Sequence, residues 1–259
     1  LTEISVADKE YCDRITMSGS KVESWEVTGN EIKNVVVGKI LSLERHPDSD
    51  HMWISMVDAG QAESVQIVTG AQNLQVGDFV PVAMDDSWLP GGVHITAGKL
   101  RGVQSNGMLC SLKELGLDTH DFPYAIEDGI FVLNSDPELS GKLTPGEDII
   151  PLVGFGDTVV EFEITNNRPD CLSVRGLARE SAATFGTALK EHTPVVSEQG
   201  EDSITDYISI EIDEPTLCPR YTARMVRNIK IAPSPLWLRR RLRASGVRDR
   251  KSTRLNSSH

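Results

Sequence analysis

Hydrophobic positions between residues 34 and 132 follow the short alternating pattern of β-strands rather than the longer period of helices. β-branched runs are separated by turn residues, and Pro90, Gly91 and Gly92 supply a tight reversal. The runs are NVVVGKILSLE, WISMVDAG, SVQIVTGA and DFVPVAM. About five short strands at this spacing predict a small closed β-barrel.

The segments on either side of this region combine helical and extended patterns. Helices are predicted at 6–17, at 236–245, and from Asp170 as N-cap to Gly186 as the stop. Strands are predicted at 21–27, 159–164 and 207–213, with a strand and polar turn at 131–149. The pattern therefore predicts an α+β fold.

The last predicted helix, LWLRRRLRAS, is amphipathic. Its leucines are expected to face inward, with Trp237 beside them, and its arginines to form a solvated outer face. These arginines are Arg239, Arg240, Arg241 and Arg243. We also expect exposed apolar surface around Leu236 and Trp237.

Composition is that of a soluble globular protein. The chain has 259 residues, 39% apolar and 25% charged, which is long enough for two compact domains. No run approaches the ~18 apolar residues of a membrane span, and the opening LTEISVADKE lacks a secretory signal pattern. The four cysteines form no Cys-x-x-Cys pair and are typical of reduced, buried thiols. We therefore expect a cytoplasmic location and no membrane partner.

The net charge of −12 is unevenly distributed. Residues 35–150 carry six Lys/Arg against seventeen Asp/Glu, a balance of −11, whereas residues 219–259 carry twelve against one, a balance of +11. Binding that depends on phosphate neutralisation alone requires a basic surface. If the predicted barrel contacts nucleic acid, it does so through a few placed residues.

The segment HPDSDHMW, residues 46–53, gathers two histidines and two aspartates. His46 and His51 are not spaced to share a helical face, and their flanks are strands, which disfavours a metal site. A Pro-Asp turn in a polar loop between strands is the favoured interpretation, and ribose or phosphate contact stays open.

The segment KLRGVQSNGMLCS, residues 99–111, makes the best case for RNA contact. Gly102 and Gly107 let the backbone bend or approach a ligand. Donors suited to phosphate, sugar and base edges surround them. These donors are Lys99, Arg101, Gln104, Ser105 and Asn106. A barrel strand pinched by glycines, with solvated ends, would explain the same residues, so both interpretations stay open.

A third motif, EFEITNNRPDCLSVRGLARE, occupies residues 161–180. No histidine lies nearby to activate Cys171, and a helix-capping role accounts for Asp170, so a catalytic cluster is disfavoured. Arg168 is held extended by the following proline and suits a salt bridge across a domain junction. We predict structural roles for Arg168 and Asp170.

These motifs carry a family resemblance. HPDSDHMW, QIVTGAQN (residues 66–73) and KLRGVQSNGMLCS resemble the tRNA-binding OB-fold module of several tRNA-handling proteins. EITNNRPDCLSVRGLARE, following at this distance, resembles the β-subunit family of bacterial phenylalanyl-tRNA synthetases. The resemblance adds Asn73 to the tRNA-contact candidates Lys99, Arg101, Ser105 and Asn106.

The resemblance also implies a domain arrangement. An OB-fold barrel at 35–150 would be inserted into a discontinuous α/β domain made of residues 1–34 and 151–190. A polar linker at 191–206 would lead to the truncated start of an editing-type α+β domain at 207–248. Residues 249–259, DRKSTRLNSSH, do not fit the family and are expected to be a non-native tail. The chain begins with Leu, so part of the natural N-terminus is expected to be missing.

The resemblance finally implies a function. The complete α2β2 enzyme would charge tRNA(Phe) with phenylalanine, using ATP and Mg²⁺. This fragment would hold no catalytic site, cofactor or metal, and its partners would be tRNA(Phe) and the α subunit, not DNA. A free-standing, non-catalytic tRNA-binding or chaperone module is the main alternative. A general single-strand-binding OB protein is disfavoured by an aromatic content of 5%, because such proteins stack bases on aromatic rings.

Overall fold

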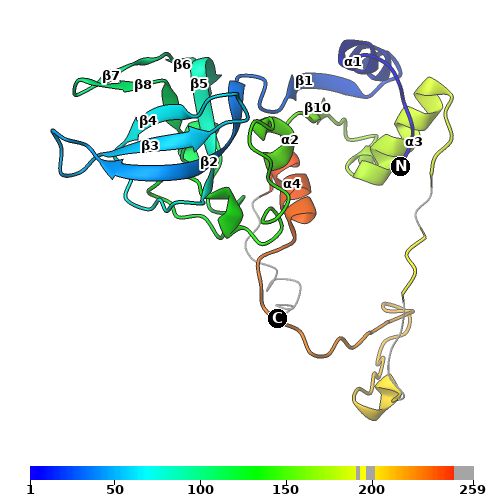
Figure 1. The fold of residues 1–259 in the computed structure, drawn as a ribbon. Helices are drawn as coiled ribbons and strands as arrows, with labels where there is room; N and C mark the ends of the chain where they lie inside the picture. Colours follow the sequence, from blue (N-terminus) through cyan, green and yellow to red (C-terminus); the bar gives the residue numbers. More distant parts are fainter. Residues whose placement is uncertain (191–192, 197–201, 248–259) are drawn as a thin grey trace. The chain divides into compact units, whose positions relative to one another are not determined.

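The computed structural model describes residues 1–190, 193–196 and 202–247 (Figure 1). The expectation for residues 249–259, and part of that for the linker 191–206, fall outside these residues. The chain forms two compact units, which are described separately. The larger unit comprises Ala7–Glu163 and the chain from Pro233, and the smaller comprises Leu1–Val6 and Ile164–Ala232.

The larger unit contains the strands (Figure 1). Its helices are α1 (Asp8–Met17), α2 (Ile149–Val153) and α4 (Leu236–Ala244), with 3-10 turns η1 (Lys113–Leu115) and η2 (Leu133–Ser135). Its strands are β1 (Lys21–Val27), β2 (Lys33–Arg45), β3 (Trp53–Asp58), β4 (Val65–Thr69), β5 (Phe79–Leu89), β6 (Val93–Ile95), β7 (Gly98–Leu100), β8 (Val103–Ser105), β9 (Gly107–Leu109) and β10 (Thr158–Glu163).

The main sheet curls into a nearly closed barrel. Its strands run in the order β4-β3-β2-β5-β6, and β9 also pairs with β5. The edge strand β4 is joined to the β8–β9 turn, where the Asn106 amide donates to the Gln66 carbonyl at 2.9 Å. The side-chain amide of Gln66 donates through Nε2 to the Gln104 main-chain carbonyl at 2.7 Å. The predicted small β-barrel is therefore present as an almost complete ring of strands.

Alternating side chains of these strands fill the barrel. The interior cluster includes Ile40, Val57, Ile67, Val80 and Leu109. A second cluster packs the outside of the sheet against the long segment that follows β9. Burying both faces of β2 and β5 explains why their sequences are nearly continuous hydrophobic runs rather than strictly alternating ones.

The predicted segments on either side of the barrel meet in the same unit. β1 pairs antiparallel with β10, and the hydroxyl of Thr158 at the start of β10 donates to the Asp8 carboxylate on α1 at 2.8 Å. Helix α1 buries Cys12 and Ile15. The helix and two strands predicted here are confirmed.

The smaller unit is built around α3 (Val174–Phe185), preceded by the 3-10 turn η3 (Pro169–Cys171) and followed by η4 (Ile204–Asp206). Helix α3 ends at Gly186, which adopts a φ of 65° as its C-cap, as predicted. A single bridge pairs Thr2 with Leu189, so residues near the start of the chain lie beside the end of this segment.

Two predicted strands are wrong. The segment after Phe131 forms η2 and turns, because the described residues pair with it only through isolated bridges, Ser111 with Ile130 at its start and Val36 with Asp148 at its end. Residues 207–213 form no strand, because no described segment pairs with them. A hydrophobic alternation specifies a strand only where a partner strand supplies the hydrogen bonds.

The prediction for α4 is confirmed for the buried Leu236 and the exposed Arg241, but its solvated arginine face is wrong for Arg239, Arg240 and Arg243. Arg239 is 3% exposed, and its Nη2 lies 2.9 Å from the Asp136 carboxylate. Arg243 donates to the carbonyls of Val153 and Gly154, both at 2.9 Å. The arginines thus satisfy a buried carboxylate and the free carbonyls at the C-terminus of α2, where cations are favoured.

The apolar residues Leu236 and Trp237 of α4 differ in their exposure to solvent. Leu236 is 8% exposed and joins the outer cluster, so the exposed surface expected there is wrong for Leu236. Trp237 is 56% exposed and lies beneath the exposed Arg241, at 5.3 Å from ring to guanidinium. Gly154 leaves room for the Arg240 side chain of α4, because a Cβ at position 154 would lie 2.3 Å from Cδ of Arg240.

Candidate nucleic-acid interface

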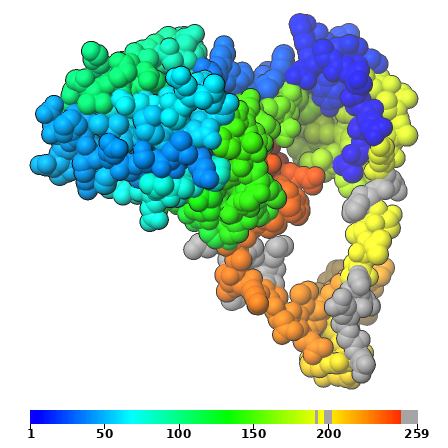
Figure 2. Space-filling model, in the orientation of Figure 1, coloured from blue at the N-terminus to red at the C-terminus, as the bar shows by residue number. Residues whose placement is uncertain are grey.

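Loop 46–52, between β2 and β3, meets the β7–β8 hairpin at one end of the barrel (Figures 1 and 2). His46 joins them: its Nδ1 accepts from the Asp48 amide at 3.1 Å, and its Nε2 lies 3.2 Å from the Leu100 carbonyl. Only an imidazole with its proton on Nε2 satisfies both partners. His46 is 3% exposed, so this histidine links two loops from inside the fold.

Two of the predicted contacts, Lys99 and Arg101, project from the β7–β8 hairpin. Lys99 stands opposite Gln104 in the hairpin, and both side chains are exposed. Arg101 forms the turn with a φ of 48°, and its guanidinium donates to the Asp48 carbonyl at 3.4 Å. The hairpin therefore presents two cations beside loop 46–52.

A third cation at this end was not predicted. Arg45 and Trp53 are opposite each other in the β2–β3 register, directly flanking the loop. The Arg45 guanidinium lies 3.7 Å from the centre of the indole ring, and donates to the Asp50 carbonyl at 3.1 Å. A hairpin drawn symmetrically about loop 46–52 would have revealed this pair, because directly opposed residues share one face of the sheet.

Trp53 is itself fixed in place. Its indole N–H donates to Oε1 of Gln72 at 3.2 Å. The Gln72 amide donates to the carbonyls of His51 and Gly70, both at 2.9 Å. Gln72 thereby orients the indole through bonds to two separate loops.

Ser105 does not share this surface. It is 4% exposed, and its hydroxyl accepts from the Val68 amide at 3.1 Å and donates to the Gly107 carbonyl at 2.9 Å. These bonds help close the barrel between β4 and β9. The Asn106 side chain is half-buried and accepts from the exposed Gln104 at 3.0 Å, while its main-chain N–H makes the closing bond to Gln66.

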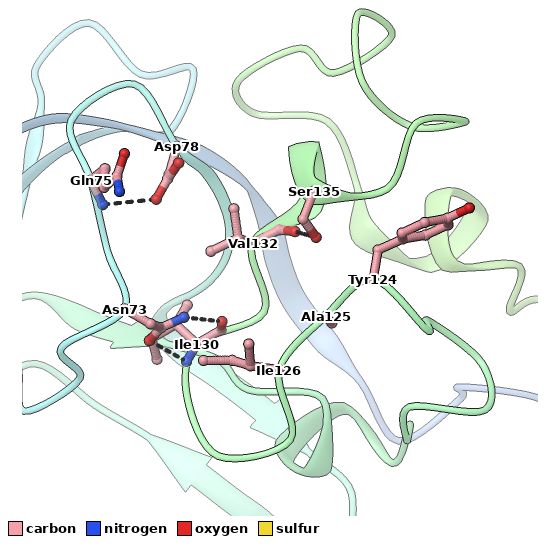
Figure 3. A pocket seen from close by; sticks show the side chains of 9 residues that line it. All are labelled: Asn73, Gln75, Asp78, Tyr124, Ala125, Ile126, Ile130, Val132 and Ser135. Atoms are coloured by element: carbon pink, nitrogen blue, oxygen red, sulfur yellow. Dashed lines mark hydrogen bonds between the residues drawn. The ribbon is translucent and has the colours of Figure 1, made fainter. Parts of the chain in front are cut away.

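Asn73 lies apart from the loop surface, in the wall of a cavity of about 260 Å³ (Figure 3). Its amide accepts from the Ile130 N–H at 3.1 Å and donates to the Ile130 carbonyl at 2.9 Å. A Cβ at Gly129 would lie 2.6 Å from the Asn73 Oδ1. This side chain therefore substitutes for a strand partner and holds the loop before Ile130 against the barrel.

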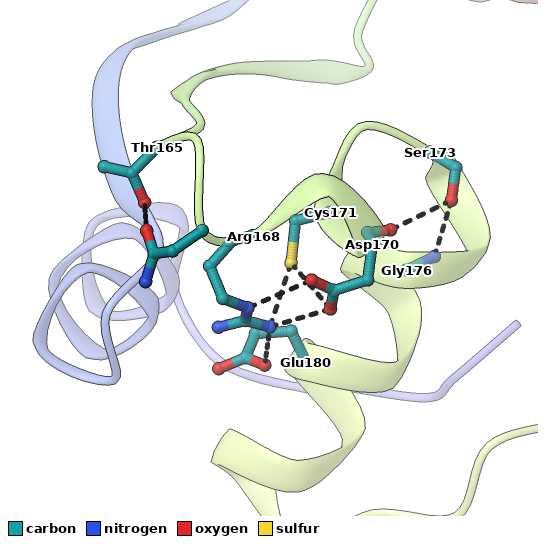
Figure 4. Close-up of polar contacts among 8 residues, drawn as sticks. Thr165, Arg168, Asp170, Cys171, Ser173, Gly176 and Glu180 are labelled. Atoms are coloured by element: carbon teal, nitrogen blue, oxygen red, sulfur yellow. Dashed lines mark hydrogen bonds and ion pairs between the residues drawn. The ribbon is translucent and has the colours of Figure 1, made fainter.

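Arg168 forms a local ion-pair cluster in the smaller unit (Figure 4). It donates to both oxygens of Asp170, at 3.1 and 3.0 Å, and to Glu180 on α3 at 2.7 Å. The Arg168 hydrogen bonds lower the pKa of the Asp170 carboxyl to about 2 and raise the pKa of Arg168. These partners lie within one unit, so the predicted bridge across a domain junction is wrong.

Asp170 does not cap α3, contrary to the prediction. Ser173 is the N-cap, and its hydroxyl accepts from the Gly176 amide at 3.0 Å (Figure 4). A Cβ at Gly176 would lie 1.7 Å from the Asp170 carbonyl oxygen, so η3 and α3 pack closely only because this position is glycine. The motif is explained by local packing and ion pairing.

The charge at the loop end of the barrel is balanced. The cations Arg45, Lys99 and Arg101 are matched in number by Glu44, Asp48 and Asp50. Arg45 and Arg101 bind main-chain carbonyls of the loop, so neither guanidinium is neutralised by an adjacent carboxylate in these contacts. Across the described part of the chain, no group of three or more His, Cys, Asp or Glu is arranged to hold a metal ion. The same residues include no helix long and apolar enough to cross a membrane.

Comparison with known proteins extends these observations. Residues 35–130 match the family described as putative tRNA binding domain, and residues 217–253 match the B3/4 domain. The chain is 45% identical, over 95% of its length, to the phenylalanine–tRNA ligase beta subunit of Clostridium acetobutylicum. It is 43% identical, over 94% of its length, to the beta subunit of Geobacillus kaustophilus. The chain spans 30% and 29% of the length of these two relatives.

Similarity to solved structures is weaker. The C-terminal domain of Plasmodium vivax p43 is 26% identical over 30% of this chain and 45% of that one. Its TM-score of 0.25 is too low to support an argument.

Proposed function

We propose that this chain, which is similar over 95% of its length to phenylalanine–tRNA ligase beta subunits, is the tRNA-binding part of such a subunit. The similarity extends well beyond the tRNA-binding match at 35–130 and includes β10 and α3. That extent favours a synthetase subunit over a free-standing tRNA-binding module. In the complete enzyme, it would join an α subunit in the cytoplasm, as an α2β2 assembly that charges tRNA(Phe).

The proposed architecture places an OB-fold at residues 35–150 within a discontinuous domain of residues 1–34 and 151–190. The pairing of β1 with β10 supports this arrangement, because these strands flank the barrel in sequence. Residues 207–248 would begin an editing-type domain, in keeping with the B3/4 match.

ATP and Mg²⁺ belong to the complete enzyme in this proposal. We propose no site for either group in this chain, in keeping with the lack of a glycine-rich phosphate loop in the sequence. We therefore assign no chemical step to this chain. Its contribution is to bind tRNA and to support the subunit.

The observation that carries the tRNA-binding proposal is the convergence of Lys99, Arg101 and Arg45 at one end of an otherwise acidic barrel. Lys99 and Arg101 are retained as tRNA contacts. Ser105, Asn106 and Asn73 are assigned to barrel closure and loop support, because the Ser105 hydroxyl, the Asn106 main-chain N–H and the Asn73 side chain hydrogen-bond to other segments of the unit.

Filter binding of tRNA(Phe), with single-stranded DNA of equal length as competitor, tests the proposal. With at most three phosphates neutralised, log K should fall with log salt at a slope of roughly −2 to −3 between about 50 and about 200 mM salt. Lys99→Ala and Arg101→Ala should each reduce this slope by about 0.7–0.9. Lys142→Ala, an exposed lysine elsewhere, is the matched control.

Tighter binding of the DNA, or an equal effect of Lys142→Ala, would refute the proposed tRNA surface. Co-purification with the α subunit tests the subunit assignment separately. That experiment requires the full-length beta subunit, since the chain spans 30% of its relatives.

A further inference from the structure

The stacked pair Arg45 and Trp53 is positioned as a binding surface rather than as an ordinary solvated contact. The guanidinium lies 3.7 Å from the indole centre, a stacking distance, and is held there by the Asp50 carbonyl. Arg45 is exposed, which leaves its side chain accessible to a ligand. Guanidinium planes stacked in this way accept nucleobases in RNA-binding proteins.

Hydrogen bonds hold both Arg45 and Trp53 in place before any ligand binds. Gln72 holds the indole edge through Nε1 and is itself fixed by the His51 and Gly70 carbonyls. His46 holds the loop that carries Asp50 against the β7–β8 hairpin. A surface already fixed before binding costs little side-chain entropy when a ligand stacks on it.

The balance of charges at the loop end of the barrel limits the electrostatic part of its affinity for RNA. The cations here are matched by nearby carboxylates, and the barrel region as a whole carries −11. Counterion release can therefore supply only a small part of the binding free energy. Stacking of a base is insensitive to net charge and contributes substantially per nucleotide.

We propose that the Arg45–Trp53 stack binds one unpaired nucleobase of the RNA, while Lys99 and Arg101 contact its flanking phosphates. This inference rests on the proposed tRNA-binding function and specifies its ligand as unpaired nucleotides rather than duplex. A single stack provides for one base. That distinguishes it from the continuous aromatic track of single-strand-binding proteins.

Variants that keep charge but change planarity test the stack. Arg45→Lys retains the cation and loses the guanidinium plane, whereas Lys142→Arg retains a cation and adds a plane at an exposed position outside this surface. Using the full chain, Arg45→Lys and Trp53→Ala should weaken binding of a single-stranded RNA oligonucleotide roughly 5- to 150-fold, with little change in salt slope. Lys142→Arg, at an exposed lysine outside this surface, should bind within about twofold of the unmodified chain. Trp53→Phe should weaken binding less than Trp53→Ala, because an aromatic plane is kept although the Nε1 bond to Gln72 is lost.

A second probe reports on stacking directly. A 2-aminopurine base in the same oligonucleotide should gain fluorescence on binding to the unmodified chain, because it leaves the neighbouring bases that quench it, and should gain less with Arg45→Lys. Equal loss of affinity for a fully paired RNA duplex would overturn the inference, as would unchanged affinity of Arg45→Lys.

The two proposals fail in different ways. If the unmodified chain binds neither tRNA(Phe) nor the oligonucleotide, the tRNA-binding function fails and the stack assignment with it. If it binds tRNA(Phe) with the salt dependence given above, but Arg45→Lys and Trp53→Ala bind equally well, only the stack assignment is wrong. Circular dichroism of each variant excludes loss of folding as the cause.

Discussion

The ion pair between Arg239 and Asp136 is expected to hold α4 against the barrel unit. The Arg239 side chain is 2% exposed and that of Asp136 is 1% exposed. Arg239 also donates through Nε to the Ser234 carbonyl at 2.8 Å and through Nη1 to the Asp121 carbonyl. Arg239→Ala would remove all these bonds and leave the Asp136 carboxylate buried without its cation.

The size of the effect follows from that uncompensated charge. Removing one member of a buried ion pair lowers the free energy of unfolding by about 3–5 kcal/mol. Because about 1.36 kcal/mol corresponds to a tenfold change, opening of α4 should become roughly 150 to 5,000 times more frequent. Asp136→Asn should also open α4, because one amide oxygen cannot replace both carboxylate oxygens, of which one accepts from the Glu138 N–H and the other from Arg239, each at 2.9 Å.

Native-state hydrogen exchange of α4 amides measures this opening. Arg241→Ala is the matched control, because Arg241 is an exposed arginine on the same helix. Arg241→Ala should change the free energy of opening of α4 by less than about 0.5 kcal/mol. Protection in Arg239→Ala that equals the Arg241→Ala value would refute the docking of α4 through its arginines. Replacing Arg239 and Asp136 together by leucine should restore part of the loss, because no unpaired charge remains.

Three further predictions concern single positions. Gly176→Ala should lower the melting temperature although alanine favours helices, because its Cβ would lie 1.7 Å from the Asp170 carbonyl; an unchanged melting curve would contradict this. Ser105→Ala should lower the free energy of unfolding in urea by about 1–3 kcal/mol, because the Val68 amide loses its buried acceptor. A smaller decrease than that caused by Lys142→Ala would contradict the role of Ser105 in barrel closure. The Asp170 carboxyl should titrate near pH 2 by NMR, and Arg168→Ala should return its pKa towards about 3.9. Because the folded pKa is lowered, its stabilisation is present above pH ~3.9 and lost as the pH falls to about 2.

Hydrophobic periodicity predicted those elements whose pattern reflects their immediate surroundings. The barrel strands, α1, β1 and β10 were found because each buries one or both faces with a regular period. The stop at Gly186 was found because a left-handed residue after a helix is a local requirement. Residues 207–213 were mispredicted because strand pairing requires a partner that their own sequence does not specify.

The candidate site was predicted only in part for the same reason. Lys99 and Arg101 were predicted as contacts from residue type and neighbouring glycines, and the structure places both on the β7–β8 hairpin. Ser105 has an equally suitable side chain, yet its hydroxyl is buried by strands that are distant in sequence. The Arg45–Trp53 stack was missed because residue type alone does not pair these two positions; they meet through the register of β2 and β3 about loop 46–52.

The orientation of α4 shows most plainly what tertiary structure decided. From sequence, four arginines on a short amphipathic helix indicate a solvated face. In the fold, Arg239 faces a carboxylate 103 residues earlier in the chain, and Arg243 faces carbonyls about 90 residues earlier. The sequence by itself determined that this segment is a helix, because that depends on local hydrogen bonds and propensity. Only the tertiary structure determined which face is buried, because a charged side chain is buried where the rest of the chain supplies its counter-charge.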